Sequence, residues 1–204
     1  FKLLCTCYSA LERHEEALCA SERGQTRAFQ EALVAGKEEG GAEGECSLHE
    51  TLVHTVQTER AVVVVYFGLG GDRLQTWVLD CQGVVRHSQE LDVSGVAAEL
   101  EAGATLQSIS GDAPDRSVGA LLNVLYQQNA DARRGSRGPT ISKHRSNVNT
   151  RYLRVLHRAL IEPLWPAIKQ CMEECGEDTP LLFVPDDWLH KVAWAGLQDA
   201  QGTH

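Results

Sequence analysis

The sequence predicts an α/β domain preceded by an α-helical hairpin. Three observations lead to this fold class. Residues 1–35 carry apolar side chains at a helical period, residues 61–91 contain strand-like segments joined by Gly-containing turns, and a long amphipathic segment precedes a second buried run at 181–185. A chain of 204 residues has room for a small helical module and one α/β domain.

The composition is that of an ordinary soluble protein. Hydrophobic residues make up 43% and charged residues 23%, and the net charge of -9 argues against a broad nucleic-acid surface. No apolar run approaches the roughly 20 residues that span a bilayer. The chain opens on Phe1 without a signal peptide's charged start, and the missing Met fits a fragment. We therefore expect a cytoplasmic protein that binds neither membrane nor nucleic acid.

The cysteines predict no metal site. There are seven, and their odd number and irregular spacing favour reduced thiols: Cys5, Cys7, Cys19, Cys46, Cys81, Cys171 and Cys175. Neither Cys-x-Cys nor Cys-x-x-x-Cys is a zinc-ribbon spacing. We expect buried or indifferent thiols, with no metal and no cofactor.

Residues 1–35 are predicted to form two helices, 1–11 and 15–35. Gly24 costs about 1 kcal/mol against Ala inside a helix, so close packing at this position is expected. Two helices alone bury too little surface, so the pair must stack on another element. The Gly- and Glu-rich residues 36–47 are predicted to be a linker, and residues 48–204 the α/β domain.

In the first part of the α/β domain, the sequence predicts a short helix at 48–57 and three strands, 61–67, 73–79 and 84–91. The first strand is apolar on both faces and should be central. The Gly-containing turns favour an antiparallel meander. The segment Gly68-Leu69-Gly70-Gly71 is interpreted as a hairpin turn, because Arg73 breaks the nucleotide-binding pattern and no helix follows.

The second part predicts helices at 93–109 and 117–132. The basic, Gly- and Ser-rich residues 133–148 are expected to form a flexible solvated loop, with an RNA or acidic-partner contact as the alternative. A long helix from 149 to 175 should break near Pro163 and Pro166.

The chain then predicts a short buried strand at 181–185, followed by a turn and a final segment from Trp188 to Leu197. Within that segment we expect Trp194 to be buried against Phe183, Leu189 and the preceding helix, where its replacement by Ala would cost roughly 3–5 kcal/mol. A half-exposed tryptophan on a surface for a partner is the alternative.

Residues 1–35 resemble a tetratricopeptide repeat that lacks its first few residues. The matching positions are Phe1, Leu4, Cys5, Tyr8, the Glu-Ala-Leu of residues 16–18, and Gly24. The proline that usually ends the repeat is replaced by Phe29, so we expect the second helix to continue. A generic helical hairpin remains the alternative.

Three later segments resemble CHAT domains, which are related to caspases and separases. They are AVVVVYFGLGGDRLQTWVL at 61–79, Leu-Ile-x-Pro at 160–163, and LLFVPDDWLHKVAWAGL at 181–197. Asp187 stands where the family usually has Gly, and Val192-Ala193 stands where Leu-Pro is common. Residues 92–148 add little to the resemblance.

The resemblance implies a caspase-like fold that uses a Cys–His dyad, in which an imidazole activates a thiolate nucleophile. In the family both residues follow the Val-Pro-Asp strand, so they are expected beyond residue 204. No catalytic residue is therefore assigned here, and this chain alone should be inactive. An internal dyad of His190 with Cys171 or Cys175 is set aside, because His190 matches a structural position and both cysteines belong to a helix end.

The remaining polar candidates have simpler explanations. Asp186 and Asp187 fit a turn, and five further histidines are interpreted as surface or packing residues: His49, His54, His87, His144 and His157.

Three functions follow from these predictions. The first is the amino-terminal portion of a cysteine peptidase with tetratricopeptide and CHAT regions. Its partners would be proteins bound through the helices of 1–35 and, for an active full-length protein, a peptide substrate. The second is a non-enzymatic scaffold of the same architecture, and the third is an unrelated α/β binding module.

Overall fold

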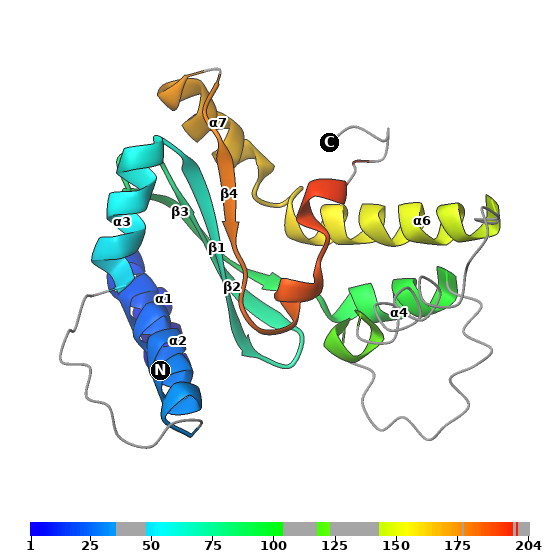
Figure 1. Cartoon of the computed structure of the whole chain (residues 1–204), viewed down its shortest axis with the longest axis horizontal. Coiled ribbons are helices and arrows are strands. Elements are labelled where there is room, and N and C mark those ends of the chain that lie inside the picture. Colours follow the sequence, from blue (N-terminus) through cyan, green and yellow to red (C-terminus); the bar gives the residue numbers. More distant parts are fainter. Residues whose placement is uncertain (36–47, 104–117, 123–142, 177, 198, 200–204) are drawn as a thin grey trace. The chain divides into compact units, whose positions relative to one another are not determined.

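The computed structural model in Figure 1 describes all residues except 36–47, 104–117, 123–142, 177, 198 and 200–204. Helices and a four-stranded mixed sheet give the chain the predicted α/β class. The chain divides into two compact units. The first comprises Phe1–Leu69, Gln75–Gln89 and Ala167–Val184, and the second comprises Gly70–Leu74, Glu90–Pro166 and Pro185–His204.

The first unit begins with the predicted helical hairpin. Helix α1 spans Lys2–Ala10 and α2 spans His14–Ala35, so α2 continues past Phe29 as expected. The predicted close packing at Gly24 is confirmed, because a Cβ there would lie 2.8 Å from the Cβ of Phe1. The residues of the predicted linker lie outside the described part of the chain, and α3 follows it at Leu48–Glu59.

The sheet contains β1 (Val62–Gly70), β2 (Arg73–Leu79), β3 (Val85–Asp92) and β4 (Leu181–Val184), in the order β3-β2-β1-β4. Short turns join β1 to β2 and β2 to β3, which makes these pairs antiparallel. Strand β4 pairs with β1 in parallel, so β1 is central, as predicted. Positive φ angles at Gly70 and Gly71 form the β1–β2 turn, which confirms the hairpin interpretation.

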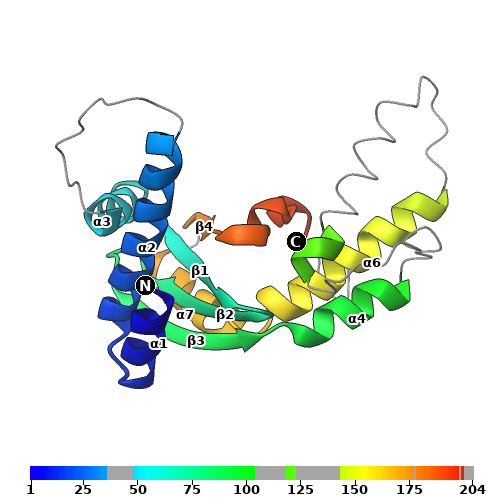
Figure 2. The same ribbon diagram turned by 90° about the horizontal axis from the view of Figure 1, so that it is seen from below.

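The core of the first unit lies between the sheet and the helices. Alternate residues of a strand face opposite sides, and one side of β1 and β2 packs against α1, α2 and α3. The buried residues of this cluster are Cys5, Ala17, Leu18, Val56, Ala61, Val63, Val65, Phe67, Trp77 and Leu79. Helix α7 (Trp165–Cys175) lies over the other side, with Ile168 and Cys171 buried (Figures 1 and 2).

The second unit contains α4 (Ser94–Gly103), a helical stretch at 118–122 and α6 (Lys143–Leu160). Arg158 of α6 pairs with Glu99 of α4. The loop prediction for 133–148 is wrong from Lys143 onward, because 143–148 carries no Gly or Pro that would stop a helix, and residues 133–142 are not described.

The predicted break in the long helix is confirmed, because a turn separates Leu160 from Trp165. Pro166 occupies the first turn of α7, where a missing backbone N–H costs no helical hydrogen bond.

The segment after β4 forms two short 3₁₀ helices, Asp187–Lys191 and Trp194–Gly196. Trp188 is the buried tryptophan of this segment, at 8% exposure, whereas Trp194 is only partly buried. A Cβ at Gly119 would lie 2.9 Å from the Cβ of Trp188, so the 118–122 helix packs directly on that residue. The prediction that Trp194 is the core tryptophan is therefore wrong.

None of the helices in the described ranges is both long and apolar enough to cross a membrane.

Candidate functional site

The turn between β2 and β3 is organised by a buried carboxylate. The Asp80 side chain is 3% exposed, and its Oδ1 accepts the backbone N–H groups of Gln82 at 2.9 Å and Val84 at 3.0 Å. The N–H of Asp80 in turn donates to the carbonyl of Val84 at 3.0 Å. Gly83 has a φ of +80°, which side-chain-bearing residues rarely adopt. Asp80 thus fixes a turn that Gly83 makes possible.

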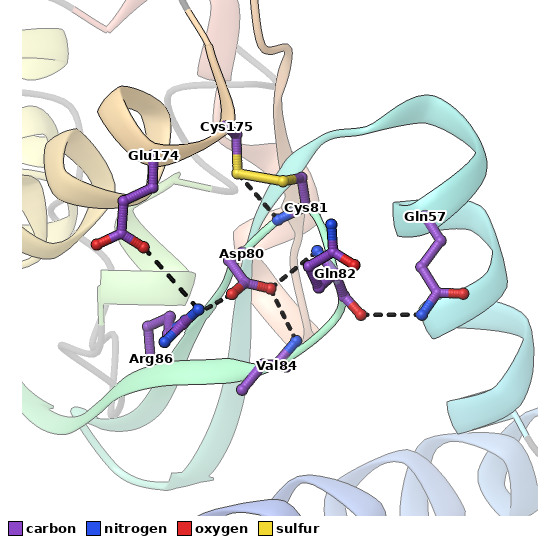
Figure 3. The surroundings of a disulfide bond; sticks show 8 residues. All are labelled: Gln57, Asp80, Cys81, Gln82, Val84, Arg86, Glu174 and Cys175. Atoms are coloured by element: carbon purple, nitrogen blue, oxygen red, sulfur yellow. Dashed lines mark hydrogen bonds and ion pairs between the residues drawn. A yellow bond between two sulfur atoms is a disulfide. The ribbon is translucent and has the colours of Figure 1, made fainter.

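Asp80 also begins a short chain of alternating charges, drawn in Figure 3. Its Oδ2 accepts a hydrogen bond from Arg86 Nε at 2.5 Å, and Arg86 Nη2 lies 3.9 Å from Glu174 Oε2 on α7. Burial alone would raise the pKa of the Asp80 carboxyl. The hydrogen bonds from Val84, Arg86 and Gln82 outweigh burial and hold this pKa below its ordinary value. Asp80 is therefore ionised at neutral pH.

Two further contacts tie the same turn to neighbouring helices. A disulfide joins Cys81 to Cys175 at the end of α7, with 6.1 Å between the Cα atoms. The N–H of Cys81 lies 3.3 Å from Cys175 Sγ and donates to it. On the other side, Gln57 Nε2 of α3 donates to the carbonyl of Gln82 at 2.9 Å. The turn is thus the point where α3, the sheet and α7 are joined.

The disulfide corrects the prediction of reduced thiols for Cys81 and Cys175. These cysteines are 94 residues apart, so sequence spacing gave no sign of the pair. Among the described cysteines, Cys5, Cys7, Cys19 and Cys171 are free thiols; Cys46 lies outside the described residues.

The residues weighed for an internal dyad occupy unfavourable places for catalysis. Cys171 is 1% exposed in the first unit, and burial, followed by the charges of Asp80 and Glu174, raises the pKa of its thiol. Cys175 is bonded to Cys81, so its sulfur is no free nucleophile. His190 lies exposed on a 3₁₀ helix of the second unit. A buried, protonated thiol is a poor nucleophile, and the net effect of burial and of the neighbouring charges keeps the pKa of Cys171 raised in spite of Arg86.

Three of the other histidines have local polar neighbours. His54 lies 3.4 Å from Thr58, His87 lies 3.2 Å from Gln89, and His157 lies 3.6 Å from Glu162. The side chains of His49 and His144 are not among those described. Within the described ranges, no group of three or more His, Cys, Asp or Glu residues could hold a metal ion.

Comparisons with protein-family models, with curated proteins and with solved structures found no match for this chain. The best-defined polar site in the described part of the chain is the Asp80 turn. It positions the Cys81–Cys175 disulfide and the charged Arg86, and it contains no pair of a free nucleophile and a base.

We predict that Asp80→Ala lowers the free energy of unfolding by about 2–4 kcal/mol, because hydrogen bonds to a charged group contribute roughly 1.5–3 kcal/mol and two backbone donors lose their acceptor. Asp80→Asn keeps an oxygen for those donors and loses only the bond from Arg86, so its cost should be smaller. Urea denaturation of both variants measures the difference.

The same experiment has a pH dependence. Since the folded state lowers the Asp80 pKa, the stabilisation is present above the unfolded pKa of about 3.9 and is lost as pH falls through the folded value. The gap between wild type and Asp80→Asn should therefore shrink in acid. A gap that is constant from neutral pH to strong acid would show that the Asp80 charge contributes nothing.

Proposed function

We propose that this chain is the amino-terminal portion of a protein with tetratricopeptide and CHAT regions, a caspase- and separase-like cysteine peptidase regulated through protein contacts of its helical hairpin. The parallel pairing of β4 with β1 carries the proposal. Val62 to Val65 of the central strand lie beside Leu181 to Val184, the strand of the Val-Pro-Asp motif. Parallel strands need a long crossover connection, usually helical, and helices α4, α6 and α7 lie in the connection between these two strands, as the resemblance to an α/β caspase-like fold implies.

The turn after β4 gives further support. Asp187 has a φ of +49°, a left-handed conformation that favours Gly, and it stands where CHAT domains usually carry Gly. Asp186 stabilises the turn, because its carboxylate accepts the N–H of Asp187 at 2.9 Å. The sequence departs from the family at this position, while the backbone keeps the conformation that glycine allows.

The hairpin supports the tetratricopeptide part of the proposal. A tetratricopeptide repeat has small residues where its two helices approach each other. Gly24 fills such a position against Phe1, and Ala17 and the neighbouring Cys5 are fully buried. Leu18 of α2 belongs to the same buried apolar cluster.

The exposed face of the hairpin favours protein binding. Both the proposed peptidase and the alternative, a non-enzymatic scaffold, would bind proteins through it. Leu3 is 77% exposed, Leu11 65% and Leu4 50%, so three large apolar side chains of α1 and its carboxyl end face outward. Exposed apolar groups that gather on one element are typical of an interaction surface.

We predict that peptides selected from a displayed library on the full chain bind at α1. The double variant Leu4→Asp, Leu11→Asp should weaken their binding by about tenfold or more, equivalent to at least about 1.4 kcal/mol. Trp165→Asp is the matched control, because Trp165 is 46% exposed and lies at the start of α7. Binding is measured by titration calorimetry, with helix content checked by circular dichroism.

If the double variant and Trp165→Asp lose the same amount of peptide affinity, binding is to exposed apolar surface in general. If the double variant binds with unchanged affinity, α1 is not part of the interface. Either result contradicts a protein-binding role for the hairpin.

A further inference from the structure

The Cys81–Cys175 disulfide holds the segment that leads into strand β4. Helix α7 ends at Cys175, and β4 starts at Leu181 after a short connection in which Gly176 has a φ of +120°. The N–H of Gly176 donates to the carbonyl of Met172 at 2.9 Å, and that of Thr179 to Gly176 at 3.2 Å. The disulfide therefore fixes the start of this connection covalently to the β2–β3 turn.

Strand β4 is only partly buried, so the prediction of a buried strand at this position is wrong for its burial. It has four residues at one end of the strand order, none of them buried, and Leu182 is 37% exposed. Its backbone pairs with β1, extended by the bond from Val62 N–H to the carbonyl of Pro180 at 2.9 Å, and Val184 packs partly buried against the core cluster of the first unit. Short strands with few buried contacts belong to the parts of a protein that open locally at low cost.

Without the disulfide, the ion pair that joins the β2–β3 region to α7 is weak. Arg86 Nη2 and Glu174 Oε2 are 3.9 Å apart, and both side chains are about half exposed. Exposed ion pairs contribute at most about 1 kcal/mol. The covalent bond closes a loop across a separation of 94 residues, and restricting so long a loop is where a disulfide stabilises most in the chain-entropy description.

The bond is also placed to react. Cys175 is partly exposed, whereas Cys81 is buried at 9% exposure, so an incoming thiolate meets Cys175 first. Attack on Cys175 Sγ breaks the S–S bond, releases Cys81 as a thiolate that takes a proton from water, and leaves a mixed disulfide. The second thiol of a dithiol then closes its own disulfide and releases Cys175, whose sulfur accepts the Cys81 N–H.

We propose that the Cys81–Cys175 disulfide is a redox clasp, which holds β4 on β1 when oxidised and lets β4 open when a dithiol reductant supplies two electrons. The neighbouring thiol Cys171 lies one helical turn earlier on α7 and is no part of the clasp. This regulation adds to the proposed function and does not depend on it, because it concerns only the α7–β4 connection.

Hydrogen exchange read by mass spectrometry on the full chain tests the clasp, before and after treatment with dithiothreitol. We expect the amides of 181–184 to exchange at least about tenfold faster after reduction, while those of 74–79 in β2 stay protected. The double variant Cys81→Ser, Cys175→Ser should exchange at the fast rate with or without reductant. Cys171→Ser is the matched control and should respond to the reductant as wild type does.

Thiol labelling of the unfolded protein must first show that two of the seven cysteines are protected before reduction and reactive after it. Protection of no cysteine, or of a pair that includes Cys171, overturns the proposal. Exchange at 181–184 that does not change on reduction overturns it as well. So does equal acceleration in β2, because the bond would then support the whole unit and not the edge strand.

Discussion

Replacing Trp77 by Ala should lower the free energy of unfolding of the first unit by about 3–5 kcal/mol, the usual range for emptying a core aromatic site. Trp77 is fully buried and packs with Val65, Phe67 and Leu79 of the sheet and with Leu18 of the hairpin. A loss of this size is a large part of a typical domain stability of about 5–15 kcal/mol. Guanidinium denaturation followed by far-ultraviolet circular dichroism measures it.

Trp77→Phe is the matched control for this experiment. The indole Nε1 of Trp77 is buried and has no hydrogen-bond partner among the described residues. Phe removes that unpaired donor and still fills most of the site, so its cost should be well below that of Ala. If Trp77→Ala costs less than about 1 kcal/mol, the hairpin does not pack on the sheet as the cluster requires.

The second large effect is expected in the segment after β4. Trp188→Ala should cost about 3–5 kcal/mol, because Trp188 is 8% exposed and lies in direct contact with the helix that carries Gly119. Trp194→Ala removes the same side chain from a partly exposed position and should cost nearer the common value of about 1 kcal/mol.

Thermal unfolding of the two variants, monitored by calorimetry, gives the comparison directly. Equal melting temperatures, or a larger loss in Trp194→Ala, would restore Trp194 as the core residue and would contradict the packing of Trp188 against the 118–122 helix.

The sheet was largely predictable from the sequence because its signals are local. The β-branched run at 61–67 and the glycines at 70–71 specify a buried strand and a tight turn whatever surrounds them. The strand from Arg73 to Leu79 has the predicted bounds for the same reason. The parallel partner of β1 lies more than a hundred residues later; its apolar run predicted a strand at 181–185, but no local pattern could predict its pairing with β1.

The missed features depend on contacts between distant segments. The sequence did not single out Asp80, because its partner Arg86 comes from a neighbouring strand and the next charge, Glu174, from a distant helix. The prediction chose Trp194 and missed Trp188, because 3₁₀ helices have no sustained period that would assign each side chain to a face. The start of α6 at Lys143 was hidden by a basic composition that is also common in loops.

The parallel pairing of β4 with β1 is best tested by nuclear Overhauser effects in isotope-labelled protein. The structure predicts contacts between backbone protons in a parallel register, with Val63 beside Leu182 and Val64 beside Phe183. Such contacts would support the caspase-like sheet on which the proposed function rests. An antiparallel pattern between 62–65 and 181–184, or no contact between these segments in the oxidised protein, would contradict both the sheet and the proposed relation to CHAT domains.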